Sequence, residues 1–130
     1  MYKTKLTASK SLIDVTTKSG KNFHYATDGS LANPLEATFA ALAGCAGVYT
    51  LKACKDLGVS AEGIEIETIP KKNLSQTFNV FGVNAFLTNV HFPEHFTSQQ
   101  KEVILESIKN CAVKELMKNG NIVEFSVEEV

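Results

Sequence analysis

Three cysteines, Cys45, Cys54 and Cys111, are the residues of this 130-residue chain with the widest scope for chemistry. A cysteine of a cytoplasmic protein is more often free, catalytic or redox-sensing than structural, because thiols stay reduced there. The reactive form is the thiolate, which attacks peroxides and disulfides and can bind a metal. The alternative is that these cysteines are small buried hydrophobic residues, as free cysteines often are. The surrounding sequence must decide between the two.

Cys45 lies in the middle of a stretch, residues 33–58, that predicts one long helix. Asn33 suits the N-cap, and Glu36 is placed to complete a capping box. Gly58 provides the usual left-handed stop. Between these caps the stretch consists mainly of alanine, glycine and leucine, and a helix that is apolar on nearly all faces is buried. Cys45 is therefore expected inside the protein.

The predicted helix is too long for a single small domain to cover. At about 1.5 Å per residue, a helix of about 25 residues is roughly 38 Å long, longer than a compact domain of this size is wide. Its apolar surface therefore predicts burial against a second copy of the chain, in a two-fold homodimer. Cys54 follows Cys45 by nine residues. At about 100° per residue it points to the far side of the helix, where the simple structural role is favoured.

The remaining chain predicts one α+β domain over residues 1–130, with the order βββ-α-ββ-α-β and mainly antiparallel sheets around the long helix. Alternating apolar residues and turn signals mark the strands. A second helix begins at Thr97, with Gln100 as its capping-box partner, and ends at Asn119-Gly120. The expected strands are Tyr2–Ala8, Leu12–Thr17, Asn22–Thr27, Glu62–Ile69, Gln76–Phe92 and Ile122–Val127.

Composition excludes several classes of function. The net charge is −1 with a pI near 6.3, which gives no electrostatic case for nucleic acid or a membrane surface. No apolar run approaches the roughly 20 residues of a membrane span, and no signal-peptide core follows the N-terminus, so a cytoplasmic location is expected. His91 and His95 stand alone at a strand end, so we expect neither a metal nor another cofactor.

Two motifs resemble those of the OsmC/Ohr family. The first runs from Asn33-Pro34-Leu35-Glu36 to Ala40–Cys45, with Cys45 eleven residues after the proline. The second is Cys111-Ala112-Val113, where the family commonly has Cys-Pro-Val. Both motifs stand in the matching order of elements, and the resemblance covers essentially the whole chain.

This resemblance implies an intertwined homodimer with thiol-dependent peroxidase activity on organic hydroperoxides or hydrogen peroxide. By carry-over, Cys45 is the peroxidatic cysteine and Cys111 the resolving one, and the two are joined by a disulfide in the oxidised state. Glu36 is the counterpart of the family's carboxylate. A low-molecular-weight dithiol or a thiol protein serves as reductant. Phe78, Phe81, Phe86 and Phe92 are expected in the core and dimer contacts, with an apolar substrate channel as the alternative.

The sequence departs from the family pattern at the groups that activate the thiol. The family uses an arginine held by a carboxylate directly after the proline, whereas all thirteen basic residues here are lysines and Glu36 stands one place later. Lys10, His24 or hydrogen-bond donors could replace the arginine, although a solvated lysine and a surface histidine are the simpler interpretations. We therefore expect a Cys45 pKa nearer the free value of about 8.5 than the low values of strongly activated cysteines. The alternative function is a non-catalytic module that binds a small apolar or electrophilic molecule at the dimer interface.

Overall fold

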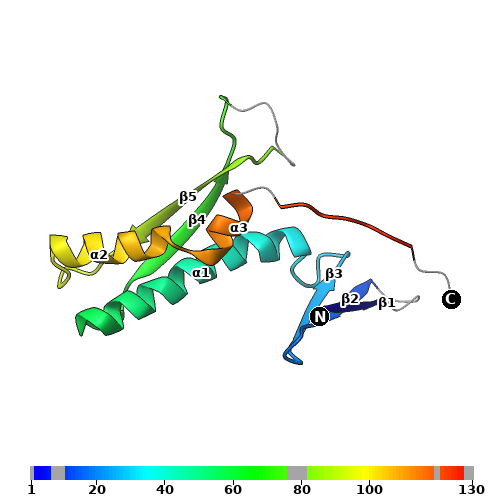
Figure 1. Cartoon of the computed structure of the whole chain (residues 1–130), viewed down its shortest axis with the longest axis horizontal. Coiled ribbons are helices and arrows are strands. Elements are labelled where there is room, and N and C mark those ends of the chain that lie inside the picture. The colour runs from blue at the N-terminus through cyan, green and yellow to red at the C-terminus, as the bar shows by residue number, and fades with distance from the viewer. Residues whose placement is uncertain (1, 7–10, 76–81, 119–120, 128–130) are drawn as a thin grey trace. The chain divides into compact units, whose positions relative to one another are not determined.

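The structure is a computed structural model that describes residues 2–6, 11–75, 82–118 and 121–127. The chain divides into two compact units, residues 1–40 and 41–130, and each is described by itself. Three strands, a long helix, two further strands and two short helices follow one another along the chain (Figure 1). The predicted mixture of antiparallel sheets and one long helix is confirmed.

The first unit contains an antiparallel meander in the order β1-β2-β3. Its strands are β1 (Lys3–Leu6), β2 (Leu12–Thr16) and β3 (Asn22–Ala26), close to the predicted bounds. Gly20, at φ 84°, makes the turn between β2 and β3. The predicted end of the first strand, at residues 7 and 8, lies outside the described residues.

Helix α1 (Pro34–Leu57) has the end signals that the sequence predicts. The Asn33 side chain accepts a hydrogen bond from the Glu36 N–H at 2.8 Å, and the Glu36 carboxylate accepts one from the Asn33 N–H at 3.3 Å. At the other end Gly58 has φ 69°. The N–H of Val59 donates to the carbonyl of Cys54 at 3.0 Å, which is the hydrogen bond of a Schellman motif.

In the second unit, β4 (Glu65–Lys71) pairs antiparallel with β5 (Ala85–His91), with Glu65 opposite His91 and Lys71 opposite Ala85. Strand β4 is shifted toward the C-terminus from its predicted bounds and runs through Pro70. In a two-stranded ladder each strand has a free edge, so a proline with no N–H can be accommodated. Residues 76–81 of the predicted strand Gln76–Phe92, which include Phe78 and Phe81, lie outside the described part of the chain.

The second predicted helix is two helices, α2 (Ser98–Lys109) and α3 (Ala112–Lys118). Thr97 and Gln100 form the predicted capping box. At the other end Asn110, at φ −90° and ψ 12°, leaves helical geometry, and its N–H donates to the Ser107 carbonyl at 3.1 Å. This tighter bond closes the last turn and breaks the helix, because asparagine is a poor interior residue that readily ends helices. The prediction of one continuous helix was wrong.

The predicted closing strand also differs. Residues 121–127 have no strand partner within the described chain, and their backbone is extended (Figure 1). The apolar side chains of their alternating pattern are exposed: Val123 by 72%, Phe125 by 93% and Val127 by 89%. A strand needs a neighbour to complete its hydrogen bonds, and the pattern in the sequence does not say which chain supplies that neighbour.

The core of the second unit lies between α1 and α2, where Ala53 and Cys54 pack with Phe96 and Ile104. Ile104 is fully buried. The Ser107 hydroxyl of α2 donates to the Tyr49 carbonyl of α1 at 3.2 Å and fixes the two helices side by side. By length and composition alone, α1 could also cross a membrane, with a mean hydropathy of 1.3 over its most apolar window. Core helices of water-soluble proteins have the same character.

Candidate active site

Cys45 and Cys111 come together in the structure, although they are far apart in the sequence. Cys45 is half-buried in the middle of α1, and Cys111 is buried at the junction of α2 and α3, with only 2% of its surface exposed. The Cys111 thiol lies beside the Cys45 sulfur, close enough to lower the pKa of Cys45. Both cysteines are free. The two predicted site cysteines therefore form one site.

The Cys45 thiolate is stabilised by hydrogen-bond donors. Burial raises the pKa of Cys45, but the Cys111 thiol and the backbone N–H groups of Val113 and Ala112 outweigh burial, and the Lys52 charge adds to them. The pKa of Cys45 therefore lies below its ordinary value. The two N–H groups belong to the first turn of α3, whose amides have no partner within the helix. The helix break that the sequence did not reveal thus presents these donors to Cys45.

The pKa of Cys111 shifts the other way. Burial raises it, and so does the hydrogen bond that the thiol makes to Cys45. Cys111 therefore keeps its proton when Cys45 loses one, and a protonated thiol can donate to a neighbouring thiolate. In this pair the surroundings favour the thiolate form of Cys45 and the protonated form of Cys111.

Cys54 has no part in this pair. It is buried in the core cluster with Phe96 and Ile104, and burial raises the pKa of its thiol. The structural role expected for Cys54 agrees with this position.

Lys52 is a residue of the site that the sequence analysis missed. It follows Cys45 by seven residues, or about two helical turns, so the two lie on one face of α1. Its ammonium lies 5.1 Å from the ring centroid of Tyr49, which occupies the turn between them. Side chains on a helix lean toward its N-terminus, so the Lys52 charge is directed toward Cys45. The i, i+7 spacing was the available signal.

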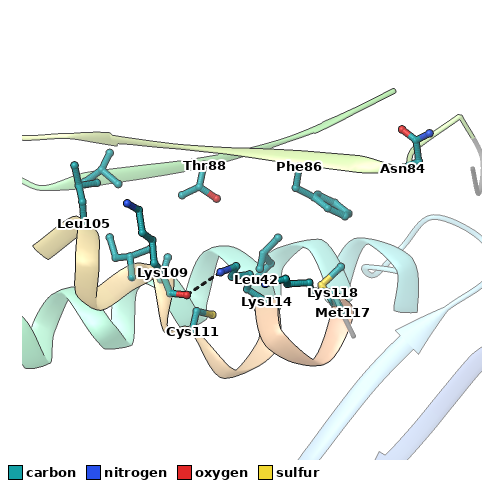
Figure 2. Close-up of a pocket in the computed structure, with 13 residues that line it drawn as sticks. Leu42, Asn84, Phe86, Thr88, Leu105, Lys109, Cys111, Lys114, Met117 and Lys118 are labelled. Carbon is teal, nitrogen blue, oxygen red and sulfur yellow. Dashed lines mark hydrogen bonds between the residues drawn. The ribbon is translucent and has the colours of Figure 1, made fainter. Parts of the chain in front are cut away.

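A cavity of about 610 Å³ opens beside Cys111 and is walled by α1, β5, α2 and α3 (Figure 2). Its lining is mainly apolar and includes Phe86, one of the aromatic residues considered for a substrate channel. Lys109, Lys114 and Lys118 also line it, and Cys111 is the cysteine that faces it. Cys45 is not among the described lining residues, so the cavity meets the site from the Cys111 side.

Comparison with known proteins is decisive for the family. The profile of the family described as OsmC-like protein matches residues 27–126, a range that includes both cysteines of the site. The chain belongs to the OsmC-like family. A search of curated proteins finds no significant match.

Solved OsmC-like structures share this fold. An OsmC-like protein from Mycoplasma pneumoniae is 13% identical, with a TM-score of 0.69 over 92% of this chain and 86% of that one. An OsmC-like protein of unknown function from Vibrio cholerae is 12% identical, with a TM-score of 0.61 over 89% of this chain and 91% of that one. A Psychrobacter arcticus protein, provisionally named for an osmotic stress induced and detoxification response, is 11% identical, with a TM-score of 0.67 over 88% and 85%.

The other residues expected at an OsmC-like site have partners of their own. Glu36 forms the α1 capping box with Asn33, and a catalytic role for it stays a prediction. His24 contacts the Asp14 carboxylate at 2.6 Å on the exposed surface of the β-meander. Lys10 lies outside the described residues. His91 lies 3.9 Å from Glu67, and the described chain has no cluster of three or more metal-ligating residues.

Proposed function

We propose that this OsmC-like protein is a thiol-dependent peroxidase that reduces organic hydroperoxides or hydrogen peroxide. In this proposal Cys45 is the peroxidatic cysteine and Cys111 the resolving one. A detoxification response appears in the name of the Psychrobacter arcticus neighbour, and for the present chain peroxide removal would be a role of that kind. The location that this function implies is the cytoplasm.

One observation carries the proposal: the Cys111 thiol lies beside Cys45, and the pKa values of the two thiols shift in opposite directions. Cys45 has donors that favour its thiolate, which is the form that attacks a peroxide. Cys111, beside it, would trap the product before over-oxidation. A pair kept only for packing would not need donors directed at one sulfur.

The reaction follows from these positions. The Cys45 thiolate attacks the distal peroxide oxygen, and the O–O bond breaks. The departing alkoxide or hydroxide takes up the proton that the Cys45 thiol released on ionisation and leaves as the alcohol or water. Cys45 then carries a sulfenic acid. Cys111 attacks the Cys45 sulfur, the S–O bond breaks, and the departing hydroxide takes the Cys111 proton to form water. An external dithiol reduces the resulting disulfide and is itself oxidised.

Treatment with one equivalent of cumene hydroperoxide, followed by peptide mapping, tests this assignment. We expect a Cys45–Cys111 disulfide and an unmodified Cys54. Cys45→Ser should abolish peroxide consumption, whereas Cys111→Ser should allow one turnover and then over-oxidation. A disulfide that includes Cys54, or no loss of thiol, would show that the roles are wrongly assigned.

The proposed active form is a homodimer. Ala41, Gly44, Val48 and Leu51 repeat at helical spacing along one exposed face of α1, where Val48 is 49% and Leu51 63% exposed. A methyl group added at Gly44 would meet no atom within 4 Å in this chain. A glycine in a helix interior costs about 1 kcal/mol against alanine, and close approach of a partner would offset that cost.

The cavity beside Cys111 supports a second candidate, the non-catalytic binding module. No reaction with any peroxide up to pH 9, in a protein whose thiols are reduced and accessible, would favour it. The cavity is of ordinary size for a small-molecule site, since such sites span about 300–1,000 Å³.

A further inference from the structure

The walls of the cavity beside Cys111 are suited to an aliphatic or aromatic group. Side chains from all four surrounding elements contribute, and the Phe86 ring points from β5 toward the helices (Figure 2). Apolar walls of this extent favour a ligand that removes its own apolar surface from water. The apolar side chains of the lining include Leu42, Phe86, Val90, Leu105, Ile108 and Met117.

The charged groups of the same lining have one sign. Lys109, Lys114 and Lys118 line the cavity, and no aspartate or glutamate is among the described lining residues. The three lysines come from the end of α2 and from α3, the two consecutive helices that wall the cavity opposite β5 (Figure 2). A site with apolar walls and several ammonium groups favours a ligand with a negative head and an apolar body.

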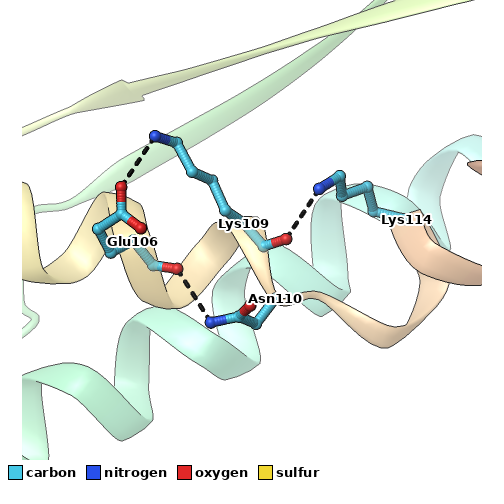
Figure 3. A network of polar contacts seen from close by, with 4 residues as sticks. All are labelled: Glu106, Lys109, Asn110 and Lys114. Carbon is cyan, nitrogen blue, oxygen red and sulfur yellow. Dashed lines mark hydrogen bonds and ion pairs between the residues drawn. The ribbon is translucent and has the colours of Figure 1, made fainter.

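Lys109 and Lys114 make polar contacts within the chain, and their side chains remain partly exposed. Lys109 contacts Glu106 at 2.9 Å, and Lys114 donates to the Lys109 carbonyl at 2.9 Å (Figure 3). Lys114 also contacts Glu115 at 3.3 Å. The Lys109–Glu106 pair is about two-thirds exposed. Exposed pairs of this kind are worth little, at most about 1 kcal/mol, so a carboxylate in the cavity can compete for the ammonium groups.

We propose that this cavity binds an amphipathic monocarboxylate, with its apolar body against the walls and its carboxylate among Lys109, Lys114 and Lys118. The ligand lies beside Cys111 and not beside Cys45, so binding requires no peroxide chemistry. The proposal therefore goes beyond the peroxidase function and does not rest on it.

Decanoate is the probe, and decanol and decylamine are its matched neutral and cationic counterparts. Isothermal titration calorimetry, at concentrations below micelle formation, should show saturable binding of decanoate to one site per chain. We expect decanol to bind at least about tenfold more weakly, and decylamine not to bind, because one charge–charge contact near a protein surface readily amounts to tenfold in affinity. Equal binding of decanoate and decanol would overturn the proposal, as would no saturable binding.

Lysine variants locate the carboxylate. The double variant Lys114→Gln/Lys118→Gln should weaken decanoate binding about tenfold and leave decanol binding unchanged. Lys101→Gln is the matched control, because Lys101 is also on α2 but lies near Phe92, outside the cavity lining. A thermal melt confirms that each variant is folded. If Lys101→Gln has the same effect as the double variant, the cavity is not the site.

Cys45→Ser separates this inference from the proposed peroxidase. The variant cannot reduce peroxide but should bind decanoate with unchanged affinity, because Cys45 is not among the described lining residues. If the parent protein did not reduce peroxide, the decanoate binding of both proteins would still support the proposed ligand site. Loss of decanoate binding in Cys45→Ser would place the ligand at the peroxidatic thiol and overturn the proposal.

Discussion

At the scale of single residues, the groups around Cys45 differ from those of the family pattern. The family pattern relies on an arginine, and this chain contains none. In its place the Cys45 sulfur has the Cys111 thiol, two backbone N–H groups and the charge of Lys52. Hydrogen bonds and a nearby positive charge both favour a thiolate, and they lower the pKa of Cys45 although burial opposes them.

Lys52→Met should raise the pKa of Cys45, because it removes the only side-chain charge that favours the thiolate among the causes identified. In the parent protein the pKa of Cys45 lies below its ordinary value. A rise in this pKa lowers the fraction of thiolate at neutral pH, so Cys45 alkylation becomes slower. A two- to threefold decrease is expected for one charge at this range, and added salt should reduce the difference. The measurement is the pH dependence of Cys45 alkylation in a background that lacks Cys54 and Cys111.

Two lysine variants serve as controls for this measurement. Lys52→Arg keeps the charge and should retain the parent pH profile. Lys55→Met removes a lysine one turn farther along α1 and should leave the profile unchanged. A Lys52→Met profile that matches the parent would mean that the hydrogen-bond donors alone activate Cys45.

At the scale of elements, the break between α2 and α3 is the feature that makes the site. A continuous helix would use the N–H groups of Ala112 and Val113 in its own hydrogen bonds. The break frees them and directs them at Cys45. The family commonly has proline where this chain has Ala112, and proline carries no N–H. The Ala112 donor is therefore a specific property of this sequence.

Ala112→Pro tests this role. Proline is favoured at the first position of a helix, so α3 should still form, but Cys45 loses one backbone donor. The pKa of Cys45 should rise, and alkylation at pH 7 should slow by about three- to tenfold, since a hydrogen bond to a charged group amounts to about one pKa unit or more. Ala112→Ser keeps the N–H and should match the parent. Unchanged alkylation in a folded Ala112→Pro protein would contradict the role.

The parts predictable from sequence are those whose signals are local. The caps of α1 and the capping box of α2 depend on residues three positions apart, and both were found. The break at Asn110 was missed because the apolar spacing of Cys111 and Leu116 continues through it. The cysteine pair followed from the family resemblance and not from the residues, because nothing local relates Cys45 to Cys111. Lys52 was missed although its i, i+7 spacing from Cys45 was visible, whereas the cavity depends on packing, which a sequence pattern does not contain.

At the scale of the whole molecule, the exposed apolar surface predicts assembly. The unpaired segment 121–127 and the exposed face of α1 both present side chains that a partner would cover. Phe125→Asp should therefore shift the protein toward monomer in sedimentation velocity at micromolar concentration, because it places a charge on the apolar face of the segment. Ser126→Asp, on the opposite face, should have little effect. A parent protein that is a stable monomer at micromolar concentration would contradict the dimer.

The C-terminal segment also has a consequence for the order of events during synthesis. Residues 121–127 leave the ribosome after every described helix and strand, and the core around Ile104 is complete without them. Folding of the second unit can thus begin on the nascent chain, since domains fold as their residues emerge. In the proposed dimer, pairing through this segment would follow only after residues 121–127 have emerged. Newly made chains would then be folded but monomeric for a time. The rate of dimer formation would depend on the concentration of the protein in the cell.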